Sequence, residues 1–338
     1  MARIILSFFV IILSIYLTEQ TYFLKQEYID NINHVASTWK AGMNFDPDTS
    51  EEYLTGLLGS KGVVRDVSKI KSRLKTHDSA YKTNMKIPKY FDSRLFWRHC
   101  TTIGEVRDQG NCGSCWAFGT TGAFADRLCI ATNGEFNQLI SAEELAFCCH
   151  LCGNGCNGGY PIKAWTYFKY HGIVSGGNYN TTDGCQPYKI SPCLHHEEGE
   201  TACDKRPMAK NQKCIKTCYG DNSLDYSNDH KYTRDAYNLA YETIQKDIIA
   251  YGPIEASFDV YDDFFNYKSG VYVKSENATY KGGHAVKLIG WGVEHGVDYW
   301  LLVNSWGYKW GNNGLFKIRR GTNECEIDDS TTGGVPVV

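Results

Sequence analysis

The distribution of cysteine is the feature that most constrains what this chain can fold into. All fourteen cysteines of the 338-residue chain lie from Cys100 onward. Such a density behind an apolar N-terminus is typical of a disulfide-linked unit made in an oxidising compartment. The sequence therefore predicts two parts of different construction, a cysteine-free leading region and a cross-linked unit after it.

Residues 1–18 have the pattern of a signal peptide. Arg3 precedes a run from Ile4 to Leu17 that is apolar except at Ser7 and Ser14. The run is shorter than the roughly 20 apolar residues that cross a bilayer, so a cleaved signal is favoured over the alternative of a signal anchor. We expect entry into the secretory pathway without stable membrane insertion, with the lysosome or the extracellular space, including a digestive lumen, as the destination.

Residues 19–86 differ in character from the rest of the chain. They carry many charges, scattered apolar residues and no cysteine, and the stretch 66–86 is polar and easily cut. Aromatic-rich sequence begins at Ile87-Pro88. The alternative of an independent small domain has few core residues in its favour, so we expect a prosegment over 19–86 and a mature domain over 87–338.

The mature part is predicted to be helical at first and mostly antiparallel afterwards, which is an α+β arrangement. Its helices are expected after Cys115, at the Ser141–Glu144 capping box, over 161–170 and before Gly252. Its strand-like runs cover 254–260, 284–289, 299–303 and 315–318. A cleft between two such halves is a natural place for a site.

Cys115 is the strongest candidate for a nucleophile. In Gln109-Gly-Asn-Cys-Gly-Ser-Cys115-Trp-Ala-Phe118 it lies where a loop rich in glycine and serine meets a predicted helix. The helix N-terminus would lower the pKa of the thiol. The free N–H groups of that terminus, together with the side chain of Gln109, are suited to bind an oxyanion.

Other interpretations of these cysteines compete with catalysis. Cys112-x-x-Cys115 has the spacing of a redox pair, but the βαβ setting of such motifs is not visible. The same pair could instead be half of a zinc site completed by Cys148, Cys149, Cys152 and Cys156. Export, and the lack of histidines at ligand spacing, favour disulfides over zinc, so neither a metal nor another cofactor is expected. A purely structural role for Cys115 is the third alternative, and the ten residues around it argue for catalysis instead.

His284 is the candidate base. It follows Gly282-Gly283 at the start of an apolar strand. Most lone histidines are surface or core residues, but here Asn304, at the end of a later strand, offers an amide to orient the imidazole. Trp306 offers an indole to cover that contact beside the substrate. The order Cys115, His284, Asn304 is that of a cysteine peptidase, with gaps that call for extra residues between the lobes.

These motifs resemble the papain family of cysteine proteases, and within it the cathepsin B group. The likeness covers nearly the whole chain after Ile87 and is most specific at Cys156-Asn-Gly-Gly-Tyr160 and in the insertion around Cys193. Trp39 to Phe45 is similar to the short propeptide of that group. The resemblance implies a two-lobed papain-like fold, with a helical left lobe and an antiparallel, barrel-like right lobe. It also implies a cleft between the lobes that the propeptide blocks in a zymogen.

The resemblance further implies which cysteines pair. The expected disulfides are Cys100–Cys129, Cys112–Cys156, Cys148–Cys214, Cys149–Cys152, Cys185–Cys218 and Cys193–Cys203. Cys115 and Cys325 would remain free thiols. Gly158 and Gly159 would present their backbone to an extended peptide substrate, where a side chain would obstruct it.

An occluding loop over about 193–203 is also implied by the resemblance. Its His195 and His196 would receive the C-terminal carboxylate of a substrate, so that dipeptides are released from the C-terminus. The alternative is a pair of solvated histidines. His195 would also pair with Asp108, which would hold the loop at low pH and loosen it as the pH rises.

The sequence departs from that group at two places. The ion pair that latches the loop has its signs reversed at Glu200 and Lys309, so we expect either a pair of exchanged polarity or two independent surface charges. Asp328 is expected at the floor of the S2 pocket, where the group has a longer glutamate. This predicts a weaker acceptance of basic P2 side chains, with Glu326 as another source of charge.

The expected function is that of a cysteine peptidase made as a zymogen, which cleaves internal bonds and releases C-terminal dipeptides. The alternatives are an endopeptidase without exopeptidase activity and a catalytically weak binding protein. Protein and peptide substrates, the propeptide itself and cystatin-type inhibitors are the expected partners. A net charge of -3 with mixed signs argues against nucleic acid. Asn180 and Asn277 are glycosylation acceptors.

Overall fold

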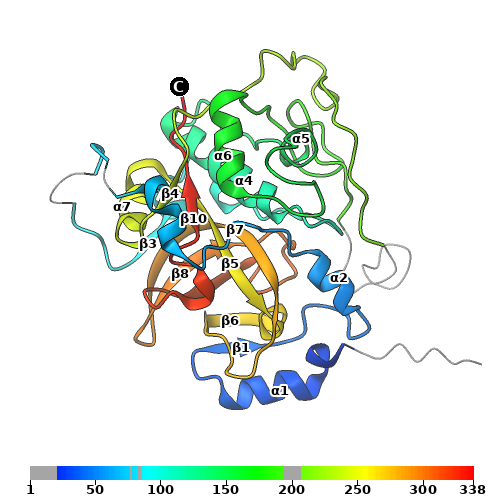
Figure 1. Cartoon of the computed structure of the whole chain (residues 1–338), viewed down its shortest axis with the longest axis vertical. Coiled ribbons are helices and arrows are strands. Elements are labelled where there is room, and N and C mark those ends of the chain that lie inside the picture. The colour runs from blue at the N-terminus through cyan, green and yellow to red at the C-terminus, as the bar shows by residue number, and fades with distance from the viewer. Residues whose placement is uncertain (1–20, 77, 82–84, 193–206) are drawn as a thin grey trace, which may run out of the picture.

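The chain folds into two lobes, a helical lobe at the top of Figure 1 and a sheet lobe below it. The computed structural model describes residues 21–76, 78–81, 85–192 and 207–338. The predicted signal peptide and the predicted occluding loop therefore lie outside the described residues. The predicted α+β class is confirmed, with the helices first and the antiparallel-rich sheet afterwards in the mature part.

The helical lobe contains α4 (Cys115–Ala131), α5 (Ala142–Cys148) and α6 (Pro161–Tyr170). Their aromatic residues share one core, in which Phe124 stacks on Phe168 with ring centroids 5.0 Å apart. Ser141 caps α5 as predicted, because its hydroxyl accepts from the N–H of Glu144 at 3.0 Å. The Glu144 carboxylate does not complete the capping box, since it accepts from the N–H of Val174 at 2.8 Å.

The sheet lobe is built on a ten-stranded sheet, counted over the described residues. Its strands are β1 (Trp39–Ala41), β2 (Leu74–Lys75), β3 (Phe91–Asp92), β4 (Tyr237–Leu239), β5 (Ile254–Tyr261), β6 (Tyr267–Tyr272), β7 (Tyr280–Glu294), β8 (Val297–Val303), β9 (Leu315–Arg319) and β10 (Thr331–Gly333). Their order is β1-β6-β9-β8-β7-β5-β10-β4-β2, with β3 beside β7. The pairs β6–β9 and β2–β4 are parallel, and the other pairs are antiparallel.

Shorter elements complete the fold. The remaining α-helices are α1 (Gln26–Val35), α2 (Glu51–Gly56), α3 (Ser93–Phe96) and α7 (Tyr241–Tyr251). The 3₁₀ segments are η1 (Tyr22–Leu24), η2 (Val67–Arg73), η3 (Thr101–Gly104), η5 (Asp262–Asn266) and η6 (Glu324–Glu326). The helix predicted before Gly252 is α7, and it ends there because Gly252 has a φ of 103°.

Strand β5 has the predicted alternation, yet both of its faces are buried. Its apolar residues enter the core of the sheet lobe. On the other face the hydroxyl of Ser257 lies 2.7 Å from that of Ser60, and Asp259 pairs with Arg65 at 2.5 Å. The polar face of β5 is therefore covered by residues that precede Ile87.

The leading region docks on the sheet lobe, along the bottom of Figure 1. Its buried apolar residues belong to the core of that lobe, and β1 pairs antiparallel with β6. Trp39 stacks on Tyr267 with ring centroids 6.2 Å apart, and its Nε1–H donates to Val273 O at 3.0 Å. The alternative of an independent small domain is therefore wrong, because this region shares a core with the lobe it covers.

Five of the expected disulfides are present in the described part of the chain. They are Cys100–Cys129, Cys112–Cys156, Cys148–Cys214, Cys149–Cys152 and Cys185–Cys218. The sixth, Cys193–Cys203, lies outside the described residues. Cys115 and Cys325 are free thiols. Because Cys112 is bonded to Cys156, it does not form a redox pair with Cys115. Of the six cysteines of the zinc alternative, all but Cys115 are engaged in disulfides.

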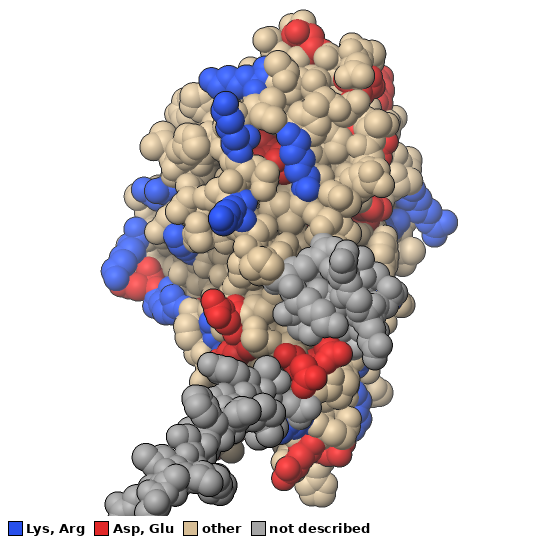
Figure 2. Space-filling view, turned by 90° about the vertical axis from the view of Figure 1, so that its right-hand side faces the viewer, with Lys and Arg blue, Asp and Glu red and all other residues tan. Residues whose placement is uncertain are grey.

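The surface carries charges of both signs. On the face shown in Figure 2, basic and acidic side chains both occur in the upper and the lower half, with neutral surface over much of the face. Within the residues that the structure describes, no helix has the length and the apolar composition needed to span a bilayer. Over the same residues, no group of three or more histidine, cysteine or acidic side chains could hold a metal ion.

Asn44 is expected to be a main anchor of the leading region. It is buried, its Nδ2–H₂ donates to the carbonyls of Phe265 and Tyr267, and its Oδ1 accepts from the N–H of Gly311. Asn44→Ala should lower the free energy of unfolding of the intact chain by about 2–4 kcal/mol, because each buried backbone group that loses its hydrogen-bond partner costs ~1–3 kcal/mol. Urea denaturation measures this.

Lys40→Ala is the matched control for Asn44→Ala. Lys40 lies in β1, close to Asn44 in the sequence, but its side chain is exposed. This substitution should change stability by less than ~0.5 kcal/mol. Equal losses for the two variants would contradict the assignment of Asn44 as an anchor.

Candidate active site

A glycine in α4 allows the sulfur of Cys115 to reach the sheet lobe. Cys115 begins α4, and Gly119 follows on the same face one turn later. A Cβ at Gly119 would lie only 3.1 Å from the backbone nitrogen of Val286 in β7. The absence of a side chain there lets the helix lie close to the strand. Farther along the same face, Asp126 forms a buried ion pair with Lys287 at 2.8 Å, which fixes the register of α4 on β7.

His284 lies on β7 next to the start of α4. The backbone N–H of the following residue, Ala285, lies close enough to the sulfur of Cys115 to favour a lower pKa of the thiol. The imidazole Nε2 lies 2.7 Å from Asn304 Oδ1. Because an amide oxygen only accepts, Nε2 carries the proton. Within the described residues Nδ1 has no hydrogen-bond partner, so it is free to accept a proton.

Asn304 and Trp306 both contact the imidazole of His284. Asn304 Oδ1 also accepts from the N–H of Ser305 at 2.8 Å, which fixes the orientation of the amide. The Trp306 ring lies over the imidazole with centroids 4.6 Å apart, and both residues are buried. Trp306 therefore shields the His284–Asn304 contact, as the sequence predicted.

A carbonyl of the leading region lies on Gln109, the residue predicted to bind an oxyanion. The Nε2–H₂ of Gln109 donates to Leu57 O at 2.9 Å, and its Oε1 accepts from the hydroxyl of Ser305 at 2.7 Å. Two residues later, the N–H of Gly59 donates to the sulfur of Cys115 at 3.2 Å. In the precursor, the contact that the leading region makes with the sulfur is thus an amide hydrogen.

Residues 59–61 lie between the two lobes and form backbone hydrogen bonds with both of them. On the helical side, Gly159 N–H donates to Gly59 O at 2.9 Å, and Lys61 N–H donates to Gly159 O at 2.9 Å. On the sheet side, Ser60 N–H donates to Gly283 O at 2.9 Å. Gly159 therefore offers its backbone to an extended chain, as expected.

Gly158 and Gly159 are required as glycines by this arrangement. A Cβ at Gly158 would lie 2.5 Å from Gly59 O, and one at Gly159 would lie 2.6 Å from the ring of Trp116. Gly158 also has a φ of 90°, which side chains other than glycine's disfavour. The Cys112–Cys156 disulfide holds this loop beside the nucleophile.

Burial changes the protonation of the pair. It raises the pKa of Cys115 to about 12 and lowers the pKa of His284 to about 4. The helix N-terminus was expected to lower the thiol pKa, but with the leading region in the cleft the loss of hydration outweighs the N–H groups of Gly59, Ala285 and Trp116. Both groups are neutral at pH 7, so the covered site holds no thiolate.

The residues expected to contact the occluding loop are only partly described. Asp108 Oδ1 accepts from the N–H of Gly110 at 2.8 Å, and burial raises the pKa of Asp108 to about 6. Lys309 is exposed, in the turn between Trp306 and Trp310. Their expected partners, His195 and Glu200, lie outside the described residues, as does His196.

The prediction that Asp328 forms the floor of the S2 pocket is wrong. Asp328 is 3% exposed. Its Oδ1 accepts from Trp300 Nε1–H at 2.7 Å, and its Oδ2 accepts from the N–H groups of Gly321 and Asn323 at 2.9 and 2.7 Å. The carboxylate therefore closes the turn before η6. Spacing from Cys325 misled the prediction, because left-handed residues around η6 redirect the side chains.

Ser330 is the residue of this segment that meets the leading region. Its hydroxyl accepts from the N–H of Val64 at 2.8 Å. Glu326, the alternative source of charge, accepts from Asn323 Nδ2–H at 2.7 Å. A wall of Ser257 and Ser330 hydroxyls thus faces residues 60–64, where the sequence predicted a carboxylate.

Some residues of the site were not found from the sequence. Gly119 is one of them, although its place four residues after Cys115 marks the same helix face. Gly59 was missed as well. A Cβ there would lie 1.8 Å from Gly113 O, so only a glycine passes over the nucleophile loop. Asn180 and Asn277 are both exposed, as glycan acceptors must be.

Comparison with protein-family models gives two matches. The model described as papain family cysteine protease matches residues 87–335. The model described as peptidase family C1 propeptide matches residues 24–63. The second range includes the segment that lies over Cys115.

Similar proteins agree with these matches. The chain is 42% identical over 315 residues to a cathepsin B-like cysteine proteinase of Schistosoma japonicum, which covers 92% of this chain and 91% of that protein. It is 44% identical over 286 residues to cathepsin B-like cysteine proteinase 6 of Caenorhabditis elegans, covering 83% and 74%.

Among solved structures, procathepsin B S9 of Trypanosoma congolense matches with a TM-score of 0.78 and 33% identity, over 93% of this chain and 98% of that one. A digestive procathepsin L2 of Tenebrio molitor matches with a TM-score of 0.66 and 27% identity, over 92% and 88%. In the structure the propeptide lies over a buried cysteine, Cys115, and close to a buried histidine, His284. Together with these matches, this shows that the chain belongs to the papain family of cysteine proteases, as a cathepsin B-like precursor.

Proposed function

We propose that Cys115 and His284 form the catalytic pair of this protease, with Asn304 as the orienting residue and Gln109 as an oxyanion donor. The observation that carries this proposal is the pair of contacts that residues 57–59 make in the cleft. A carbonyl oxygen lies on Gln109 and a backbone amide lies on the sulfur, so the cleft already binds an extended chain at the atoms that chemistry requires.

The chemistry follows from these positions once the cleft is open. The thiol of Cys115 gives its proton to Nδ1 of His284, and the thiolate attacks the carbonyl carbon of the substrate. The resulting oxyanion is bound by Gln109 and by the amides at the start of α4. The imidazolium then protonates the leaving amine as the C–N bond breaks, which leaves a thioester. Finally, His284 takes a proton from water, which attacks the thioester, releases the acid and restores the thiol.

The zymogen is activated by removal of residues 19–86 at a junction near Lys86-Ile87. The polar stretch 66–86 is suited to cutting, and the papain-family match begins at residue 87. A signal peptide over 1–18 directs the chain to the lysosome or the extracellular space. Its substrates are proteins and peptides, and cystatin-type inhibitors are further partners.

The processed enzyme also removes dipeptides from free C-termini, through His195 and His196 of an occluding loop over 193–203. Support for this activity comes from the sequence motif around Cys193 and from the similarity to cathepsin B-like proteinases. An endopeptidase without this activity is the alternative. Because Asp328 is turned away from the cleft, no preference for basic P2 side chains is proposed.

Cys115→Ser should reduce the hydrolysis of a peptide amide by at least roughly 10⁴-fold, because a hydroxyl paired with an imidazole of this site is a far weaker nucleophile than a thiolate. The variant is processed in trans, and its turnover is measured by fluorescence release. Cys325→Ser is the matched control, since it removes the other free thiol and should leave turnover unchanged. If both variants retain activity, Cys115 is not the nucleophile.

Lowering the pH from 7 to 5 should favour release of residues 57–61 from the cleft. His284 has a pKa of about 4 while it is covered, against 6.5 for a hydrated histidine. The open form binds more protons between these values, so stability of the closed form is lost as the pH falls through 6.5 and levels off below about 4. This linkage predicts a roughly 20-fold shift toward the open form between pH 7 and pH 5.

Hydrogen exchange at the amide of Gly59 measures this opening, after correction for the intrinsic effect of pH. The parent carries Cys115→Ser to prevent self-cleavage, and the comparison variant adds His284→Gln. The parent should show the shift, and the comparison variant should lose most of it. The same pH response in both would show that other groups control the opening.

C-terminal dipeptide release should depend on a free carboxylate in the substrate. The processed enzyme is expected to cleave a peptide acid faster than the matching C-terminal amide. The double substitution His195→Ala and His196→Ala should lower kcat/KM for the acid by about 10–100-fold, because charge-assisted hydrogen bonds are lost, and spare internal cleavage. Equal rates for acid and amide in the parent enzyme would favour the pure endopeptidase.

A further inference from the structure

A second contact between the leading region and the mature domain lies away from the cleft. After residues 57–61 cross the cleft, the chain runs to α7 and β4, on the left of Figure 1, whereas α2, which leads into the cleft, lies on the right. There β2 adds to the edge of β4 as a parallel strand, with Lys75 opposite Leu239. Thr243 of α7 donates its hydroxyl to Lys75 O at 3.0 Å.

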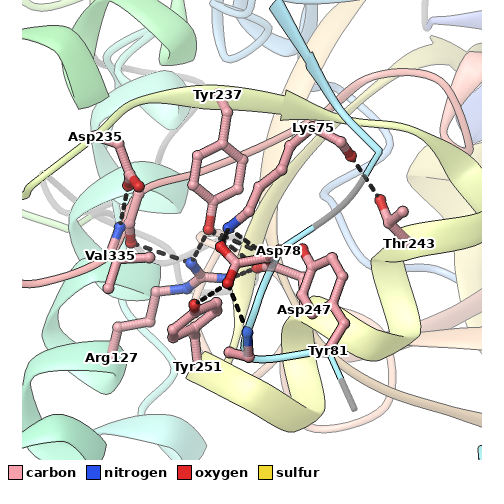
Figure 3. A network of polar contacts seen from close by, with 12 residues as sticks. Lys75, Asp78, Tyr81, Arg127, Asp235, Tyr237, Thr243, Asp247, Tyr251 and Val335 are labelled. Carbon is pink, nitrogen blue, oxygen red and sulfur yellow. Dashed lines mark hydrogen bonds and ion pairs between the residues drawn. The ribbon is translucent and has the colours of Figure 1, made fainter. Parts of the chain in front are cut away.

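The side chain of Lys75 enters a cage of aromatic rings and carboxylates (Figure 3). Its Nζ lies 3.8 Å from the ring centroid of Tyr237 and 4.7 Å from that of Tyr251. It also lies 3.3 Å from Asp247 Oδ2 and 2.8 Å from Asp78 Oδ2. The lysine side chain is only 10% exposed. Both cation–π and ionic attraction are strengthened by this exclusion of water.

The cage walls belong to the mature domain and have partners of their own. Asp247 Oδ1 pairs with the buried guanidinium of Arg127, and Tyr237 donates its hydroxyl to Asp247 Oδ2 at 3.0 Å. Arg127 also donates to the carbonyls of Pro253 and Gly334. The walls therefore hold their shape without the lysine.

The leading region supplies the rest of the contact. Tyr81 donates its hydroxyl to Asp247 Oδ2 at 2.6 Å, and Asp78 Oδ1 accepts from the hydroxyl of Tyr251 at 2.8 Å. When residues 19–86 leave, Asp247 Oδ2 loses the Lys75 and Tyr81 donors, and β4 is left with an unpaired edge. Such an edge binds an added strand, and such a carboxylate between two tyrosine rings binds an ammonium group.

We propose that the processed protease carries a binding site for an extended, lysine-bearing peptide strand at the β4 edge, walled by Tyr237, Thr243, Asp247 and Tyr251. In the precursor the site is filled by residues 74–76 and 78–81 of the same chain. Its ligand is a strand with lysine in the cage and an acidic residue three positions later, as in Lys75 and Asp78. The proposal rests on the proposed removal of residues 19–86, and it concerns binding alone, separate from hydrolysis.

Binding of a labelled peptide of residues 70–81 tests the proposal. The partner is the processed enzyme with its active-site thiol alkylated, so that the cleft is blocked, and fluorescence polarisation gives the affinity. Lys75→Met in the peptide should weaken binding by at least roughly tenfold, since the charge is lost at nearly constant length. Lys71→Met is the matched control, because Lys71 is exposed, and it should leave binding unchanged.

One variant of the enzyme tests the wall of the site. Tyr251→Phe keeps the ring but removes the hydroxyl that bonds Asp78, so it should weaken binding of the parent peptide by roughly threefold or more. The affinity of the Tyr251→Phe enzyme should also no longer depend on whether the peptide carries Asp78 or the substitution Asp78→Asn. Asp247 is left intact, because its loss would strand the buried charge of Arg127.

The full chain gives an independent measurement. The junction near residue 86 is cut in a Cys115→Ser chain, and the release of residues 19–86 is followed by native mass spectrometry. Lys75→Met should speed this release relative to Lys71→Met. The proposal is overturned if the peptide does not bind, if the two methionine variants bind equally, or if they release at the same rate. None of these readouts requires turnover, so they do not depend on whether Cys115 is the nucleophile.

Discussion

The close approach of α4 to β7 is the contact on which the site depends. Cys115 begins α4 in the helical lobe and His284 lies on β7 in the sheet lobe, and Gly119 lets the helix lie against the backbone of Val286. The Asp126–Lys287 pair, buried in the same interface, holds the register. A buried ion pair stabilises little in net terms, but losing one partner is costly. The pair therefore specifies how the lobes are aligned more than how stably they associate.

The prosegment uses backbone rather than side chains where it crosses the cleft. Gly59 fits beneath the Gly113 carbonyl because it has no Cβ, and Gly159 and Gly283 bond to the chain from the two lobes. We propose that an extended substrate uses the same backbone groups of the cleft. The prosegment differs from a substrate in the group that it places at the sulfur of Cys115, because the N–H of Gly59 donates a hydrogen bond to that sulfur. The prosegment therefore fills the cleft through backbone hydrogen bonds and places an amide hydrogen on the sulfur.

Burial links this occupancy to protonation. The covered thiol and imidazole are both neutral, because desolvation raises one pKa and lowers the other. Opening the cleft restores water and allows the ion pair to form, so the prosegment blocks both access and charge separation. The cage around Lys75 holds the same segment at a second place, where charges are buried but paired. Opening of the cleft contact is coupled to protonation of His284. The cage contact is broken when β2 separates from β4.

The sequence by itself determined the α+β order, the cap of Ser141 on α5, the end of α7 at Gly252 and the set of residues that meet in the cleft. These follow from local signals, because caps, glycines and periodic patterns act within a few residues, and from the resemblance to a known family. The tertiary structure decided the direction of Asp328, the burial of both faces of β5 and the raised pKa of Cys115. Each of these depends on what packs against a residue from far along the chain, and neither spacing nor composition records that.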